Sequence, residues 1–312
     1  MSHTIAQQEK RSAALISVIA AVGLTSFKII VGLLTNSLGI LAEAAHSALD
    51  LAAALMTLFA VRMADKPADR EHNFGHGKIE NLSALFEAIL LLLTSAWIIN
   101  EAIDRLFFKK AQVEISIWSF IVMGTSIAID ITRSRILYRA AKKYNSQALE
   151  ADALHFSTDV WSSSVVILGL IGVTISRLVS GLTWMSEADA IAALLVAVIV
   201  IFVSGELGWR TITALLDTAP KGMTERITAE VGKIKGIHDC HAVRIRPSGA
   251  RWFVDLHVTM DGERTLNETH AITEKVEKKV HRILRESDVT VQVEPLEMAE
   301  KRDLSHQRSC EC

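Results

Sequence analysis

Two short stretches of the chain repeat one pair of metal-binding residue types at the same spacing. The stretch "AEAAHSALD" at 42–50 contains His46 and Asp50, and "ADALHFSTD" at 151–159 contains His155 and Asp159. Residues four apart lie on one face of a helix, so each histidine would lie beside its aspartate. Two such faces brought together would supply two imidazole nitrogens and two carboxylates, a ligand set suited to tetrahedral Zn2+.

Both pairs lie in stretches made mostly of Ala, Leu, Val and Ile. Ionisable side chains in the hydrocarbon region of a membrane are costly, and they usually face a polar partner or a water-filled cavity. Each histidine could simply hydrogen-bond its own aspartate, but the repetition of the pair favours a ligand site. Ligand type alone leaves Cd2+, Co2+, Fe2+ and Mn2+ open, whereas Mg2+ would prefer more oxygen ligands.

A second candidate cluster lies in the polar segment "DKPADREHNFGHGK" at 65–78, which contains Asp69, His72 and His76. Gly75 and Gly77 would let the backbone turn tightly, so that both imidazoles could face one ion together with the carboxylate. Histidines are common in exposed polar loops, so an ordinary solvated loop is the alternative interpretation.

The composition indicates how these clusters are positioned. The chain has 312 residues, of which 50% are hydrophobic and 22% charged, and this combination favours a membrane part joined to a polar part. The formal net charge of -2 argues against a nucleic-acid partner. Six apolar runs have roughly the 20 residues that a membrane-spanning helix needs. They lie at about 12–34, 37–64, 79–107, 113–138, 147–178 and 185–214, and predict a six-helix transmembrane transport domain at 1–217.

Basic residues are distributed unevenly between the segments that flank these runs. The candidate cytoplasmic segments carry Lys10, Arg11, Arg62, Lys66, Arg70, Lys78, Arg133, Arg135, Arg139, Lys142 and Lys143, and the opposite side carries Arg105, Lys109, Lys110 and Arg177. Cytoplasmic loops of membrane proteins carry an excess of Lys and Arg. With six spans, this asymmetry places both termini in the cytoplasm. Inside the spans, Lys28 and Asp130 are expected to extend toward the membrane surface.

The chain becomes polar and periodic after residue 217. Amphipathic helices are expected at 223–236 and 266–286, and strands at 240–249, 251–260 and 288–295. The order αββαβ predicts a cytoplasmic α+β domain at 218–297 with an antiparallel sheet. Residues 298–312, with His306, Cys310 and Cys312, are expected to form a flexible tail.

Three segments together, "AEAAHSALD", "ADREHNFGHGKIENL" and "EADALHFSTD", resemble the cation diffusion facilitator family, and the resemblance covers about 11–297. It implies a zinc-type bacterial metal exporter: a homodimeric, multi-pass inner-membrane protein with a ferredoxin-like or metallochaperone-like cytoplasmic domain. Members exchange a cytoplasmic divalent metal for protons by alternating access. Zn2+ would then be both the transported substrate and a regulatory ligand.

The resemblance also implies roles for individual residues. The transport site would consist of His46, Asp50, His155 and Asp159, and a second metal site of Asp69, His72 and His76. Lys78 would form a charge pair with Asp217 near the dimer interface.

In the cytoplasmic domain, His241, His257 and His270 match positions at which similar proteins bind two zinc ions between protomers. The sequence departs from that pattern in its last strand, where Gln292 replaces a histidine and Glu294 an aspartate. His238, Asp239 and Cys240 are further ligand types nearby. Incidental histidines at a partly wet sheet edge are the alternative.

Metal binding requires neutral imidazoles and ionised carboxylates, so protons and Zn2+ would compete for the transport site. Two other functions remain open from the residues alone. A membrane-bound zinc hydrolase would need an open coordination position, which a symmetric four-ligand set does not offer. A metal sensor without transport could be built on the cytoplasmic domain. A transporter, not an enzyme, is the prediction.

Overall fold

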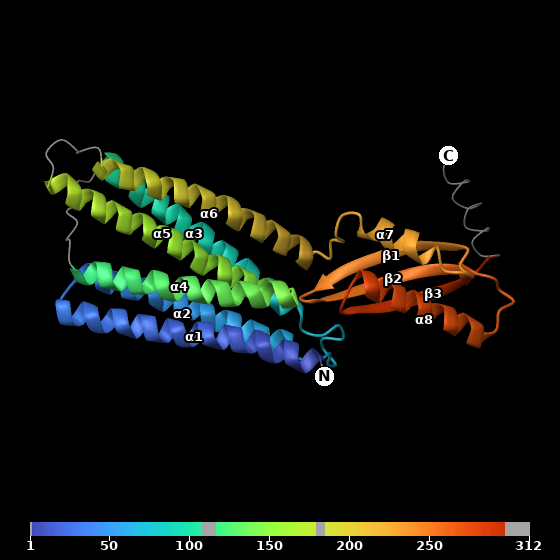
Figure 1. Cartoon of the computed structure of the whole chain (residues 1–312). Helices are drawn as coiled ribbons and strands as arrows, with labels where there is room; N and C mark the ends of the chain where they lie inside the picture. The colour runs from blue at the N-terminus through green and yellow to red at the C-terminus, as the bar shows by residue number, and fades with distance from the viewer. Residues whose placement is uncertain (1, 108–116, 179–184, 297–312) are drawn as a thin grey trace. The chain divides into compact units, whose positions relative to one another are not determined.

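The computed structural model describes residues 2–107, 117–178 and 185–296, in two compact units, Met1–Ile212 and Thr213–Cys312. The predicted tail at 298–312 lies outside the described residues. The first unit is a bundle of long helices (Figure 1). They are α1 (Ser2–Thr35), α2 (Leu38–Ala64), α3 (Lys78–Phe107), α4 (Ile117–Tyr144), α5 (Gln147–Leu178) and α6 (Met185–Leu215).

Two of the helix connections use the same Asn-Ser pair. Asn36 between α1 and α2, and Asn145 between α4 and α5, adopt positive φ angles of 50° and 51°. Asparagine tolerates this left-handed conformation better than most residues, so it ends each helix abruptly. Ser37 and Ser146 then accept hydrogen bonds from backbone N–H groups in the first turn of the next helix. Helices α1 and α2, and α4 and α5, consequently pack as neighbouring pairs.

The chain is an α-helical membrane protein. Within the described residues, four segments are long and apolar enough to cross a bilayer: Ile5–Thr35, Leu38–Ala64, Lys78–Asp104 and Leu194–Leu215. Large apolar side chains lie on the outside of the helices, where lipid would cover them. Examples are Leu93, Trp97 and Phe202, which are 62%, 65% and 75% exposed.

The inside of the bundle is lined by small residues and by polar groups that pair with one another. Alanines from α1, α2, α4 and α5 pack around Phe156 and Leu137, and small residues let membrane helices approach closely. The expectation that Lys28 and Asp130 extend toward the membrane surface is wrong. Lys28 Nζ donates to Ser47 Oγ at 2.8 Å, and Asp130 Oδ1 accepts from Arg133 at 3.2 Å. Both charged groups find internal partners on neighbouring turns or helices.

The second unit contains α7 (Met223–Val231), β1 (Asp239–Ser248), β2 (Arg251–Met260), α8 (Leu266–Ile283) and β3 (Ser287–Pro295). This is the predicted αββαβ order. The sheet has the order β1-β2-β3, in which β1 and β2 are antiparallel but β2 and β3 are parallel. The prediction of a purely antiparallel sheet is therefore wrong for β3. Helix α8 connects β2 to β3 as a crossover, which returns the chain to the same end of the sheet.

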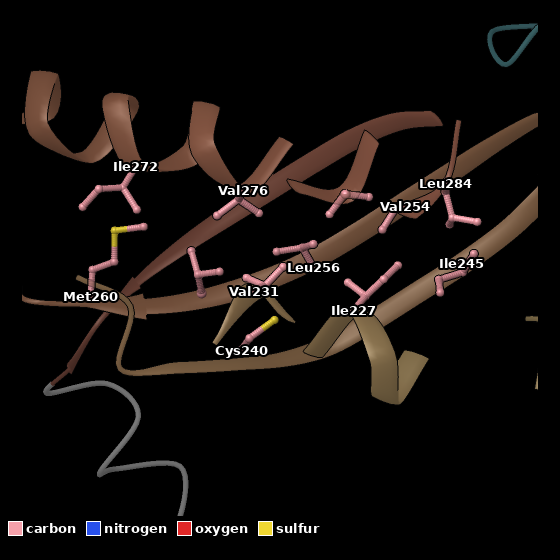
Figure 2. Packing of buried hydrophobic residues seen from close by; sticks show 12 residues of the cluster. Ile227, Val231, Cys240, Ile245, Val254, Leu256, Met260, Ile272, Val276 and Leu284 are labelled. Atoms are coloured by element: carbon pink, nitrogen blue, oxygen red, sulfur yellow. The ribbon is translucent and has the colours of Figure 1, made fainter. Parts of the chain in front are cut away.

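One face of this sheet forms the core of the second unit. Figure 2 shows Val254 and Leu256 of β2 packed against Val276 of α8 and Ile227 of α7. In β2, Val254, Leu256 and Val258 are fully buried and alternate with partly buried residues, but Thr259 at the end of the strand is buried as well. The opposite face of the sheet is left for polar residues.

Candidate metal centres

The two His/Asp pairs of the sequence meet inside the helix bundle, on the neighbouring helices α2 and α5. His155 Nε2 lies 3.2 Å from Asp50 Oδ1 and 3.6 Å from Asp159 Oδ2. His46 Nε2 lies 3.8 Å from Asp50 Oδ1 and 4.0 Å from Asp159 Oδ1. We refer to these four residues as the bundle site.

These distances suit a four-coordinate zinc ion. Ligand atoms at about 2.0–2.2 Å from Zn2+ in a tetrahedron lie about 3.3–3.6 Å from one another. The four contacts of the bundle site fall between 3.2 and 4.0 Å. The two histidines contact different oxygens of Asp159, and ligand atoms of His46, Asp50 and Asp159 lie within 4.8 Å of one another. Side-chain movements would be needed to bring His155 and these three residues to a single ion.

The bundle site is enclosed unevenly. The His155 and Asp50 side chains are 5% and 12% exposed, whereas the His46 side chain is 36% exposed. Asp159 is intermediate at 19%. The cluster is closed around His155 and open at His46.

The loop between α2 and α3 brings its three predicted ligands together. Asp69 Oδ1 lies 3.3 Å from His72 Nδ1, and Asp69 Oδ2 lies 3.3 Å from His76 Nε2. The backbone N–H of His72 donates to Asp69 at 2.7 Å, and this bond is the main cause of the lowered pKa of that carboxyl. Gly75 turns the chain with a φ of 75°, while Gly77 does not adopt a positive φ. We refer to these three residues as the loop site.

A third cluster lies on the polar face of the sheet in the second unit. His241 of β1 is paired with His257 of β2 in the strand register. Glu294 of β3 reaches both: its Oε1 lies 2.7 Å from His257 Nδ1 and its Oε2 lies 3.3 Å from His241 Nε2. Asp239 contacts His241 Nδ1 at 2.8 Å. We refer to these four residues as the sheet site.

Three other residues near this site in the sequence or in the family pattern do not join the cluster of His241, His257, Glu294 and Asp239. Gln292 is paired with His257 in the register, and its amide reaches Glu294 at 3.5 Å. Cys240 points into the hydrophobic core instead, as Figure 2 shows, and burial raises the pKa of its thiol to about 11. The expectation of Cys240 as a nearby ligand is therefore wrong. His270 lies on α8 with its side chain 73% exposed and contacts Glu274 at 3.8 Å.

The sequence interpretation overlooked several buried charged groups of the bundle. Glu87 on α3 is completely buried, and its Oε2 lies 3.3 Å from His155 Nδ1. Lys10 Nζ lies 2.8 Å from Glu80 Oε1 and 2.9 Å from Asp65 Oδ1. The signal for Glu87 was available, because it is an acidic residue inside the apolar run "ALFEAILLLL".

The two residues of the predicted Lys78–Asp217 charge pair belong to different compact units. Lys78 begins α3 in the first unit and Asp217 follows α6 in the second. The pair stays a prediction.

A bundle of long apolar helices with a partly buried two-histidine, two-aspartate cluster, attached to a small α+β unit, is typical of membrane proteins that handle metal cations. Comparison with protein families agrees with this class. Residues 14–216 match the cation efflux transmembrane domain, and residues 219–296 match the cytoplasmic domain of cation efflux proteins. The chain belongs to the cation efflux family, which confirms the resemblance seen in the sequence.

Curated relatives match over nearly the whole chain. The cation-efflux pump FieF of Citrobacter koseri is 30% identical over 300 residues, which are 95% of this chain and 95% of the relative. FieF of Yersinia enterocolitica is 30% identical over 301 residues, 95% of this chain and 96% of the relative. The protein is a cation efflux transporter rather than an enzyme, so the hydrolase and sensor alternatives are set aside.

Two solved structures are similar to part of the chain. A zinc form of CzrB is 25% identical, covers 25% of this chain and 90% of its own, and has a TM-score of 0.23. A structure of the MamM CTD is 25% identical, covers 23% of this chain and 91% of its own, and has a TM-score of 0.22.

Proposed function

We propose that this transporter exports Zn2+ from the cytoplasm in exchange for protons, and that the bundle site carries the ion. The observation that supports the proposal is that each of the two histidines, His46 and His155, lies 3.2–4.0 Å from both aspartates of the bundle site. A set of two histidine nitrogens and two carboxylates fits zinc better than magnesium, which prefers an octahedral oxygen shell. Cd2+, Co2+, Fe2+ and Mn2+ are the competing substrates to be tested.

Proton coupling follows from the same atoms. His155 Nε2 and Asp50 Oδ1 lie at hydrogen-bond distance, 3.2 Å, so a proton on the imidazole would hold them together. Zinc needs the lone pair on that nitrogen, so it binds only when the proton leaves. Protons that enter the site from the far side of the membrane would displace the ion, which would then leave on that far side.

The remaining predictions are part of the same proposal. The helices α1–α6 would all span a bacterial inner membrane, with both termini in the cytoplasm, and the transport domain would end near residue 217. The domain at 218–297 would dimerise, which would place the sheet site close to a second copy and allow His270 to contribute from there. The loop and sheet sites would bind regulatory zinc. Asp69 and Glu294 each bridge two histidines, which supports this assignment.

Zinc flux into proteoliposomes tests the proposal. Asp50→Ala and Asp159→Ala should abolish the flux, because two imidazoles and one carboxylate carry too little negative charge to hold a divalent ion in the membrane. Asp255→Ala is the matched control, since that carboxylate is 43% exposed on the second unit and contacts Arg244 at 3.8 Å. It should transport like the parent. Near-normal flux in either bundle-site variant would contradict the assignment.

A further inference from the structure

The two ring nitrogens of His155 face different surroundings. Nε2 faces the bundle site, with Asp50 Oδ1 at 3.2 Å and Asp159 Oδ2 at 3.6 Å. Nδ1 faces away from these carboxylates, toward α3, and lies 3.3 Å from Glu87 Oε2. The imidazole is therefore placed between the bundle site and one further carboxylate.

Glu87 is held for this contact by a third helix. Its Oε1 accepts a hydrogen bond from Thr57 Oγ1 of α2 at 3.4 Å, and both residues are completely buried. Glu87 Oε2 and His155 Nδ1 are shut off from solvent, and neither atom makes a hydrogen bond in the described part of the chain, although they lie 3.3 Å from each other. Each atom is thus a polar group whose available partner is the other.

We propose that Glu87 is a positioning residue for the transport site: it accepts the Nδ1–H of His155 and so leaves the Nε2 lone pair free for the ion. This inference rests on the proposed role of the bundle site. A neutral imidazole has one N–H donor and one acceptor nitrogen, and the hydrogen bond made by one nitrogen determines which nitrogen can bind a metal. A carboxylate behind a metal-binding histidine also fixes the ring orientation and raises its basicity.

His46 differs from His155 in this respect. Its side chain is 36% exposed, and its contacts in the described residues are with Asp50 and Asp159 of the site itself. The structure therefore holds one imidazole of the site in place through α3 and leaves the other more open. Loss of Glu87 should act on metal affinity through His155 alone.

The test measures initial rates of Zn2+ uptake against zinc concentration, with the full chain in proteoliposomes. Glu87→Leu should raise the KM for zinc by about 10–100-fold, the usual loss when a partner behind a metal ligand is removed. Glu87→Gln should keep a KM close to that of the parent, because its amide oxygen can still accept the Nδ1–H. A purely structural role would lower the amount of active protein, and hence the maximal rate, without changing the KM.

Two further variants complete the experiment. Glu80→Leu removes another buried carboxylate of the same helix, which pairs with Lys10 and Ser146 and not with the bundle site, so its KM should match the parent. Glu87→Met replaces the leucine variant if that protein does not fold.

The proposed function and this inference fail in distinguishable ways. Normal flux in Asp50→Ala would overturn the transport site itself. If Asp50→Ala abolishes flux while Glu87→Leu or Glu87→Met keeps the parental KM, the positioning role of Glu87 is overturned. A KM in Glu87→Gln that is as high as in Glu87→Leu would overturn it too.

Discussion

Replacing Lys10 by methionine should destabilise the helix bundle strongly, although this residue contacts none of the candidate metal sites. Lys10 Nζ lies 2.8 Å from Glu80 Oε1 and 2.9 Å from Asp65 Oδ1. The three side chains are 8%, 1% and 4% exposed. The ammonium group thus links α1 to the start of α3 and to the residue that follows α2.

The size of the effect follows from what the substitution leaves behind. Glu80 would keep a hydrogen bond from Ser146, and Asp65 would keep its contact with Arg11 at 3.1 Å, but neither carboxylate would have its buried cation. Removal of one partner from a buried ion pair typically costs about 3–5 kcal/mol, because a buried charge is left uncompensated. Neutralising the carboxylates as well, with Asp65→Asn and Glu80→Gln, should recover most of this loss.

Lys143→Met is the matched control. Lys143 also pairs with a glutamate of α1, Glu9, but these side chains are 59% and 47% exposed. Exposed ion pairs often contribute nothing measurable to stability. Unfolding of the purified full chain by SDS titration should therefore show a large loss for Lys10→Met and none for Lys143→Met. Equal stability of the two variants would refute the reasoning.

Three more predictions concern the metal sites and the core. His46→Asp exchanges a nitrogen ligand for an oxygen and should relax discrimination against Mn2+ and Fe2+ relative to Zn2+. Zinc flux measured in the presence of each competing metal tests this. An unchanged order of metal preference would show that site shape, not ligand type, sets the preference. Glu294→Gln should lower the zinc occupancy of the full chain in calorimetric titration, because it removes the carboxylate that bridges two histidines; unaltered stoichiometry and affinity would contradict the sheet site. The pKa of about 11 keeps Cys240 as a neutral thiol below that pH. In a Cys310→Ser, Cys312→Ser background, alkylation of Cys240 should therefore be slow at pH 8 and accelerate toward pH 11. Fast reaction of the folded protein at pH 8 would disprove this.

The bundle site could be predicted from the sequence because its geometry is mostly local. A spacing of four residues places His46 beside Asp50, and His155 beside Asp159, on one face of each helix. The repetition of the pair then indicates that the two faces meet. Glu87 has no such repetition, and its proximity to His155 depends on the lateral packing of α3 against α5. Sequence spacing does not report lateral packing.

The α+β unit shows the same limit. Burial alternates along β2 from Val254 to Val258, a pattern that depends on the strand alone, but it ends at Thr259, which is also buried. The direction of β3 depends on how α8 crosses the sheet, and the prediction was wrong there. Cys240 lies between two ligand candidates in the sequence but on the opposite face of the strand, a consequence of the two-residue period.

Zinc and proton movement measured in the same proteoliposomes, with one dye for each ion, tests the exchange mechanism most directly. An outward proton gradient should drive zinc uptake, and a zinc gradient should move protons in the opposite direction. Both movements should disappear in Asp159→Ala. Zinc flux of unchanged rate after the proton gradient is collapsed, with no accompanying pH change, would contradict proton-coupled export through the bundle site.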